Sequence, residues 1–183
     1  MIDLYEELKA LVRKLDESRI DYALCGGMAL AIYGVPRATV DLDLLIPSEA
    51  LGKVSRMAKE RGYVFAARPM VLSSGAILIH RFSKKDEETG FRVSLDFLLV
   101  TPSLEDVWNE RQTLEWEEGK LQVGSREGLI RLKSLRKSGQ DLEDIARLKE
   151  GQGDCGATQV CIPTDASLFF AGQSQTRPSE EKK

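Results

Sequence analysis

Asp41 and Asp43 are the residues of this sequence whose type and spacing most clearly suggest chemistry. They lie in the stretch 40–46, where apolar and acidic residues alternate before the stretch becomes apolar, a pattern that predicts a β-strand. Residues two apart on a strand project from the same face, about 6–7 Å apart at the backbone. At an effective dielectric constant of about 20, two like charges at that distance repel each other by about 2–3 kcal/mol. Because Mg²⁺ prefers carboxylate oxygens and shares them with substrate phosphates, the pair predicts a magnesium site.

A third acid, Asp96, lies in a second predicted strand, 91–100. If this strand lies beside the first, Asp96 joins Asp41 and Asp43 on one face of the sheet. Three carboxylates suffice to bind two metal ions about 3.5–4 Å apart, which activate an attacking hydroxyl and stabilise a leaving phosphate. We therefore expect all three to be catalytic residues and ligands of two Mg²⁺ ions, with Asp96 as ligand or base for the hydroxyl. The simpler alternative for Asp41 and Asp43 is a solvated strand face that Arg37 or Arg92 neutralises.

Gly26 and Gly27 follow the apolar stretch 21–25, which predicts a buried strand, and precede the helix-forming stretch 28–33. A glycine turn between a strand and a helix lets an anion approach the backbone N–H groups at the start of the helix. The two glycines therefore predict a phosphate site, and the residues between them and Asp41 suffice for one helix and a turn. The simpler alternative is that they form only a turn.

Two basic residues are candidates for contacts with a triphosphate. Arg37 lies in a loop after Pro36, where it either contacts phosphate or pairs with an aspartate. Lys133 lies on the predicted helix 125–136, which carries an excess of basic residues. The alternative for Lys133 is a place on a solvated helix face, which is the commoner role of charged residues on a helix.

The sequence predicts one domain, residues 1–150, of mixed α and β structure. The spacing of apolar residues and the capping signals predict helices at 3–18, 47–61, 125–136 and 138–150. Apolar or alternating stretches predict further strands at 63–66 and 76–82 and a hairpin at 113–116 and 120–123. Residues 151–183 are rich in glycine, serine, threonine, glutamine and proline, so we expect a disordered tail or one that a partner orders.

The composition excludes several classes of protein. The 183 residues are 42% hydrophobic and 30% charged, with a net charge of −3, which allows a hydrophobic core and excludes wholesale disorder. The apolar runs are too short to span a bilayer and the acidic start differs from a secretion signal, so we expect a cytoplasmic protein without membrane partners. One histidine and three irregularly spaced cysteines exclude a histidine-rich metal site, a disulfide framework and a four-ligand zinc site.

The order of these features resembles that of the nucleotidyltransferase superfamily of the DNA polymerase β type. Within it, the sequence is most similar to small prokaryotic proteins related to the AbiEii toxins. The resemblance covers about residues 20–150, and its motifs are Cys25-Gly26-Gly27-Met28-Ala29-Leu30, Arg37-Ala38-Thr39-Val40-Asp41-Leu42-Asp43-Leu44 and Leu95-Asp96-Phe97. It implies an α/β (α+β) fold, a mixed sheet flanked by helices with a helical pair at the C-terminal end of the domain.

The resemblance also implies an enzyme that transfers a nucleoside monophosphate from a nucleoside triphosphate to a hydroxyl on RNA, a protein or a small molecule. Two Mg²⁺ ions would bind the three aspartates. The triphosphate would contact residues of the glycine motif and two basic residues, namely Gly26, Gly27, Met28, Arg37 and Lys133. A domain of this size leaves little room for a separate acceptor-binding domain, which favours a homodimer or a partner protein such as an antitoxin.

Met28 departs from the family pattern, in which serine or threonine often ends the glycine motif and helps to hold the triphosphate. A methionine side chain cannot donate that hydrogen bond. The alternative function is therefore a non-catalytic nucleotide-binding protein, or a toxin–antitoxin partner protein, that keeps the same fold. A haloacid-dehalogenase-type phosphatase also carries an Asp-x-Asp motif, but it has no preceding Gly-Gly helix.

Overall fold

The computed structural model describes residues 2–136 and 138–151. The predicted tail therefore lies, except for Gly151, outside the described residues. Within the described part, eight strands form one sheet in the order β3-β5-β6-β2-β1-β8-β7, with β4 paired to β5. The strands are β1 (Ala23–Cys25), β2 (Asp41–Ile46), β3 (Phe65–Ala66), β4 (Met70–Leu72), β5 (Ile77–Lys85), β6 (Arg92–Leu99), β7 (Gln112–Trp116) and β8 (Gly119–Val123).

The sheet is mixed, as predicted. Strand β2 runs parallel to β6, and β1 runs parallel to β8, whereas the other paired strands are antiparallel. Strands β2 and β6 lie in the middle of the sheet, and nearly all their residues are buried. Central strands that are covered on both faces carry long apolar runs. This explains why polar side chains on these two strands stand out in the sequence.

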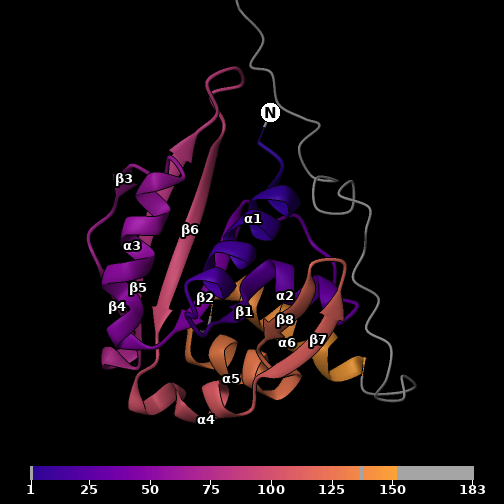
Figure 1. Ribbon diagram of the computed structural model, residues 1–183. Helices are drawn as coiled ribbons and strands as arrows, with labels where there is room; N and C mark the ends of the chain where they lie inside the picture. Colours follow the sequence, from indigo (N-terminus) through magenta and orange to yellow (C-terminus); the bar gives the residue numbers. More distant parts are fainter. Residues whose placement is uncertain (1, 137, 152–183) are drawn as a thin grey trace, which may run out of the picture.

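Helices flank the sheet, and the described residues form six α-helices. They are α1 (Leu4–Glu17), α2 (Gly26–Ile32), α3 (Leu51–Glu60), α4 (Glu105–Asn109), α5 (Arg126–Arg136) and α6 (Gly139–Glu150). The side chain of Asp3 caps α1 by accepting hydrogen bonds from the backbone N–H groups of Tyr5 and Glu6. Figure 1 shows α4 and α5 at the bottom of the view with α6 near them, and α3 alongside β5 and β6 at the left.

The apolar face of α1 explains how the sheet is covered. Its buried residues recur at the spacing of one helix face, which a helix that packs against a core requires. They are Leu4, Tyr5, Leu8, Leu11, Val12 and Leu15. Together with residues of the central strands they belong to one continuous core. None of the described helices combines the length and apolarity that crossing a bilayer demands.

Most predicted elements are confirmed, and the differences have local causes. Strand β4 was not predicted because it has three residues at the edge of the sheet, none of them buried, so no alternation of polarity marks it. Helix α4 was missed because its five residues are too few to show a helical period. Helix α2 begins at Gly26, so both glycines form its first turn rather than a turn before it.

Candidate active site

Three aspartates meet on strands β2 and β6. The parallel register pairs Asp43 directly with Asp96, and Asp41 lies two residues before Asp43 on the same strand. Side chains at paired positions project from the same face of a sheet, as do side chains two residues apart on one strand. Asp43 and Asp96 are 9% and 2% exposed, whereas Asp41 is half-buried. The structure therefore brings the three predicted acids together on one face.

Asp43 carries the least compensated charge of the three. Burial, followed by the charges of Asp96 and Asp41, raises the pKa of Asp43 to about 6. Burial also raises the pKa of Asp41, although the Arg81 guanidinium acts in the opposite direction. Among the described residues, no side chain forms a hydrogen bond or an ion pair with the Asp43 carboxylate. A buried carboxylate without a donor is a site at which a cation would be strongly stabilising.

Gly26 leaves the space that the Asp43 carboxylate fills. A Cβ atom at position 26 would lie 1.8 Å from Asp43 Oδ2, and the φ angle of Gly26 is +63°. Both the missing side chain and the left-handed backbone therefore require glycine at this position. At Gly27, a Cβ atom would lie 2.7 Å from Thr39 Oγ1. The glycine pair thus packs helix α2 tightly against the strand that carries the aspartates and the loop before it.

The side chain of Met28 is part of the hydrophobic core, and the residue is 2% exposed. A thioether offers no hydroxyl, so any contact of Met28 with phosphate would involve its backbone N–H group in the first turn of α2. The predicted contact of Gly26, Gly27 and Met28 with phosphate remains a prediction that concerns backbone atoms.

The residue that the sequence analysis missed is Arg81 on β5. Its Nε and Nη2 atoms donate hydrogen bonds to the two carboxylate oxygens of Asp96, at 2.7 and 2.6 Å. Its Nη2 atom also lies 3.6 Å from Asp41 Oδ2. The antiparallel register of β5 and β6 pairs Arg81 with Asp96. The sequence offered only a partial signal, because the charged loop 84–90 predicts a hairpin between these two strands but does not specify its register.

The carboxylates of Asp41 and Asp43 suit a divalent ion, whereas that of Asp96 is already paired with the Arg81 guanidinium. Within residues 2–136 and 138–151, no three acidic, histidine or cysteine side chains converge closely enough to enclose a metal ion. Asp41 and Asp43 offer the carboxylate oxygens that Mg²⁺ prefers, and Asp43 has no other partner among the described residues. The residues present therefore fit a magnesium ion at Asp41 and Asp43.

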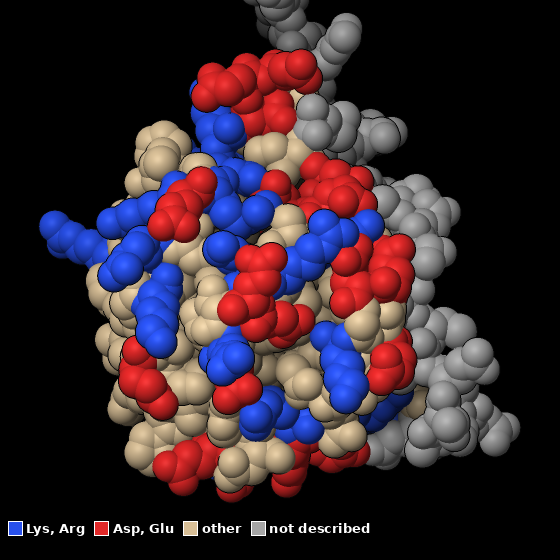
Figure 2. All heavy atoms as spheres, in the orientation of Figure 1, with Lys and Arg blue, Asp and Glu red and all other residues tan. Residues whose placement is uncertain are grey.

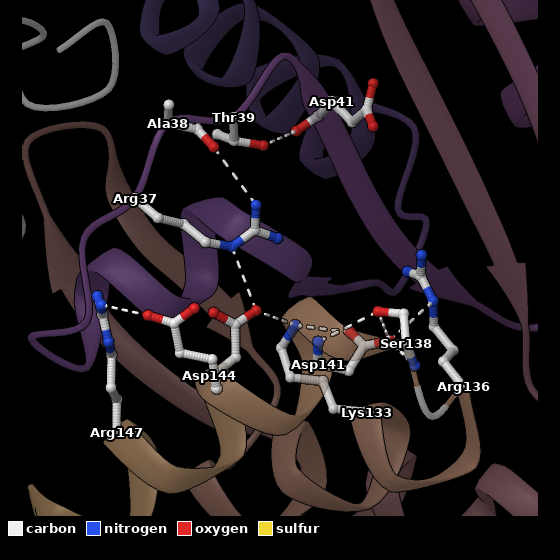
Figure 3. Close-up of polar contacts among 11 residues, drawn as sticks. Arg37, Ala38, Thr39, Asp41, Lys133, Arg136, Ser138, Asp141, Asp144 and Arg147 are labelled. Atoms are coloured by element: carbon white, nitrogen blue, oxygen red, sulfur yellow. Dashed lines mark hydrogen bonds and ion pairs between the residues drawn. The ribbon is translucent and has the colours of Figure 1, made fainter. Parts of the chain in front are cut away.

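The two basic residues predicted as triphosphate ligands meet in a buried ion-pair network (Figure 3). Lys133 Nζ on α5 lies 2.6 Å from Asp144 Oδ2 and 3.2 Å from Asp141 Oδ1 on α6. Arg37 Nε lies 3.3 Å from Asp144 Oδ2. The network ties the helical pair to the loop before β2. Arg37 thus pairs with an aspartate, and the predicted contacts of Arg37 and Lys133 with phosphate remain untested.

The same network contains the capping box predicted at the start of α6. The Ser138 hydroxyl accepts a hydrogen bond from the Asp141 backbone N–H, and the Asp141 carboxylate accepts one from the Ser138 backbone N–H. The capping box is therefore confirmed. Asp141 serves twice, because it also pairs with Lys133.

A small hollow of about 20 Å³ lies between α5 and Asp43. Its volume suits about one water molecule. The residues that line it come from β1, α2, β2, β6 and α5, namely Cys25, Gly26, Asp43, Leu98, Leu129, Leu132, Lys133 and Arg136. The side chain of Arg136 is 42% exposed, and its charge lowers the pKa of Asp43, against the larger effect of burial. Arg136 and Arg81 are therefore two cations whose charges act on Asp43. From the sequence, Arg136 was only one of several basic residues on the predicted helix 125–136.

Comparisons with known proteins identify the fold. No family model and no curated protein matches the sequence. The lincosamide antibiotic adenylyltransferase LnuA, solved with lincomycin bound, matches over 80% of this chain and 97% of its own, with a TM-score of 0.51 and 20% identity. A Thermotoga maritima protein, described provisionally as a nucleotidyltransferase, matches over 80% of this chain and 90% of its own, with a TM-score of 0.50 and 18% identity. The chain therefore has the nucleotidyltransferase fold, as predicted.

The raised pKa of Asp43 predicts how stability depends on pH without metal ions. Between the ordinary pKa of 3.8 and about 6, the folded chain binds more protons at Asp43 than the unfolded chain does, so stability falls as pH rises through this window. Asp43 alone should lower the free energy of unfolding by about 3 kcal/mol from pH 3 to pH 7.5. Urea unfolding in EDTA should show that Asp43→Asn lacks this loss.

Asp106→Asn is the matched control, because it removes an exposed carboxylate on α4 that pairs with Arg131. This variant should keep the pH dependence of the original chain. Parallel pH profiles for Asp43→Asn and the original chain would show that Asp43 titrates at its ordinary pKa.

The contact between Gly26 and Asp43 predicts a large cost for one added methyl group. Gly26→Ala should lower the free energy of unfolding by about 2–5 kcal/mol, because alanine strains the left-handed backbone and overlaps the carboxylate. Gly52→Ala is the control, because a Cβ atom there meets nothing within 4 Å on helix α3. It should stabilise the chain by about 0.5–1 kcal/mol. Equal effects of the two substitutions in thermal unfolding would contradict the assigned role of Gly26.

Proposed function

We propose that the chain is an enzyme that transfers a nucleoside monophosphate from a nucleoside triphosphate to a hydroxyl group and that it depends on Mg²⁺. The observation that carries the proposal is the group of three carboxylates on two neighbouring strands, beside the glycine turn of α2. The nucleotidyltransferase fold supports it. Because a fold alone does not specify a reaction, the proposal depends mainly on the three carboxylates.

In this proposal, each acid has a role that follows from its surroundings. Asp41 and Asp43 hold Mg²⁺, because Asp43 is buried and lacks a donor among the described residues. Asp96 serves the attacking hydroxyl, as its metal ligand or as the base that takes its proton. A bound Mg²⁺ ion supplies positive charge to the phosphate oxygens. The second ion of the predicted pair requires Asp96 to be free of Arg81.

The proposed reaction is a displacement at the α-phosphorus. The acceptor oxygen forms a bond to this phosphorus, the bond to the pyrophosphate oxygen breaks, and pyrophosphate leaves with that electron pair. The acceptor proton passes to Asp96 or to solvent. The N–H groups in the first turn of α2 bind phosphate oxygens, and the protein contributes mainly by orienting the two reactants.

The acceptor is the part of the proposal that depends most on the comparisons. LnuA is an adenylyltransferase of a small molecule, and nearly its whole length is matched by this chain. Figure 2 shows acidic and basic side chains interspersed over the face drawn there. We therefore rank a hydroxyl-bearing small molecule first, before an RNA end or a protein side chain.

One observation favours the alternative of a non-catalytic nucleotide-binding protein, or of a toxin–antitoxin partner with this fold. The Met28 side chain is buried and offers no hydroxyl to a triphosphate. The two functions differ in one measurable respect. A binding protein is stabilised by a triphosphate without transferring any part of it.

Label transfer tests the proposal. The chain is incubated with each α-³²P-labelled nucleoside triphosphate, Mg²⁺ and, in separate reactions, a set of polyhydroxylated small molecules, total RNA or a protein extract. Label should move to one acceptor class, and Asp41→Asn should reduce the rate by at least about 100-fold, because it removes a carboxylate from the cation site. Asp106→Asn is the control and should retain the rate.

The other results of this experiment discriminate between the functions. Transfer that persists in Asp41→Asn would contradict the assigned site. Thermal stabilisation by a triphosphate and Mg²⁺, without transfer to any acceptor, would favour the binding protein. If neither transfer nor stabilisation occurs, both functions fail.

A further inference from the structure

Arg81 stands between two of the three aspartates, at the edge of the site nearest to β5. It donates one hydrogen bond to each carboxylate oxygen of Asp96 and lies 3.6 Å from Asp41 Oδ2. Bidentate pairing of a guanidinium with a carboxylate is among the strongest hydrogen-bonded contacts in proteins. Both oxygens of Asp96 are therefore occupied by the same side chain.

Arg81 supplies the positive charge that faces two of the three aspartates. Within the described residues, Arg81 is the one basic side chain that forms an ion pair with any of the three aspartates. Asp96 is 2% exposed, whereas the Arg81 side chain is 35% exposed. The carboxylate is therefore fixed in the interior, and the guanidinium reaches it from the solvent side. Of the two side chains, that of Arg81 is the one with room to move into solvent.

We propose that Arg81 is a built-in counterion that holds Asp96 and competes with a divalent cation for the space between Asp96 and Asp41. This inference rests on the proposed function, because it assumes that Asp41 and Asp43 bind a metal ion. It predicts that the chain binds one divalent ion readily, through Asp41 and Asp43. A second ion binds only when the guanidinium leaves Asp96. Arg81 is thus a positioning residue that sets how many ions the site holds.

Arg92 offers a matched control for the loss of one positive charge. It lies on β6, four residues before Asp96 and on the same face of that strand. Its guanidinium lies over the ring of Phe65, 5.4 Å from the ring centroid, and is exposed. Arg92→Gln therefore removes a charge from the same strand face without freeing a carboxylate of the site.

The experiment counts Mn²⁺ ions, whose free form gives an electron paramagnetic resonance signal, in titrations without nucleotide. The original chain and Arg92→Gln should each bind one ion per chain in the site. Arg81→Gln should bind two, with the second at least about tenfold tighter than any second ion in the original chain, because a carboxylate becomes available. Asp41→Asn should lose binding in the site.

The possible results separate this inference from the proposed function. Equal numbers and affinities in Arg81→Gln and Arg92→Gln, both abolished by Asp41→Asn, would overturn the role of Arg81 and leave the metal site standing. If neither the original chain nor any of these variants binds Mn²⁺ at the aspartates, both the metal site and this inference fail.

Loss of Arg81 leaves the buried Asp96 without a counterion, so Arg81→Gln can lose its fold in EDTA. In that case circular dichroism provides the readout. Mn²⁺ should restore the folded spectrum of Arg81→Gln, because the ion replaces the guanidinium between Asp41 and Asp96. The double variant Arg81→Gln/Asp96→Asn should fold without Mn²⁺. Failure of Mn²⁺ to restore Arg81→Gln, while the double variant folds, would overturn the proposal.

Discussion

Repulsion among three carboxylates is the constraint on which this structure depends. Strands β2 and β6 pair Asp43 directly with Asp96 and hold Asp41 two residues away on the same face. In a buried setting such charges are costly unless a cation compensates them. Arg81 compensates Asp96 and partly Asp41. Asp43 has no ion-pair partner among the described residues, and its pKa is raised because it is buried beside two other acids.

The elements around the aspartates can be understood from this constraint. Gly26 begins α2 without a side chain, and the Asp43 carboxylate fills the space that a Cβ atom would need. Helix α5 closes the other side of the hollow, with Lys133 and Arg136 among its lining residues. The Lys133 ammonium on α5 forms ion pairs with Asp141 and Asp144 on α6, which join the two helices. Arg37 in turn joins Asp144 to the loop before β2. The site is thus built on rigid elements rather than on long loops.

The sequence revealed the parts of the site that follow local periodicity. Alternation along β2 and β6 correctly put Asp41, Asp43 and Asp96 on strand faces, and the serine and aspartate of the capping box marked the start of α6. Whether Asp96 lay beside Asp43 depended on strand order, which spacing in the sequence does not specify. The mixed sheet and the helical pair followed from the motifs and from the family resemblance.

The residues that were missed or reinterpreted depend on contacts between distant segments. The partner of Arg81 is set by the register of the hairpin between β5 and β6, which in turn depends on the exact length of its loop. The glycine pair also leaves space for Asp43 and Thr39, which the sequence analysis did not foresee, and its predicted contact with phosphate stays a prediction. Lys133 was predicted as a triphosphate ligand, with a solvated helix face as the alternative. The packing of α6 against α5 buries Lys133 and excludes the alternative.

The central claim is that the Asp43 carboxylate lacks a cation until a divalent ion binds. Carbon-13 NMR of the side-chain carboxyl carbon of Asp43, assigned with Asp43→Asn, tests it most directly. Without metal ions, the resonance should titrate with a midpoint at about 6. With saturating Mg²⁺, the midpoint should fall below the ordinary 3.8, because a bound cation favours the charged form. A midpoint that Mg²⁺ leaves unchanged would contradict the claim.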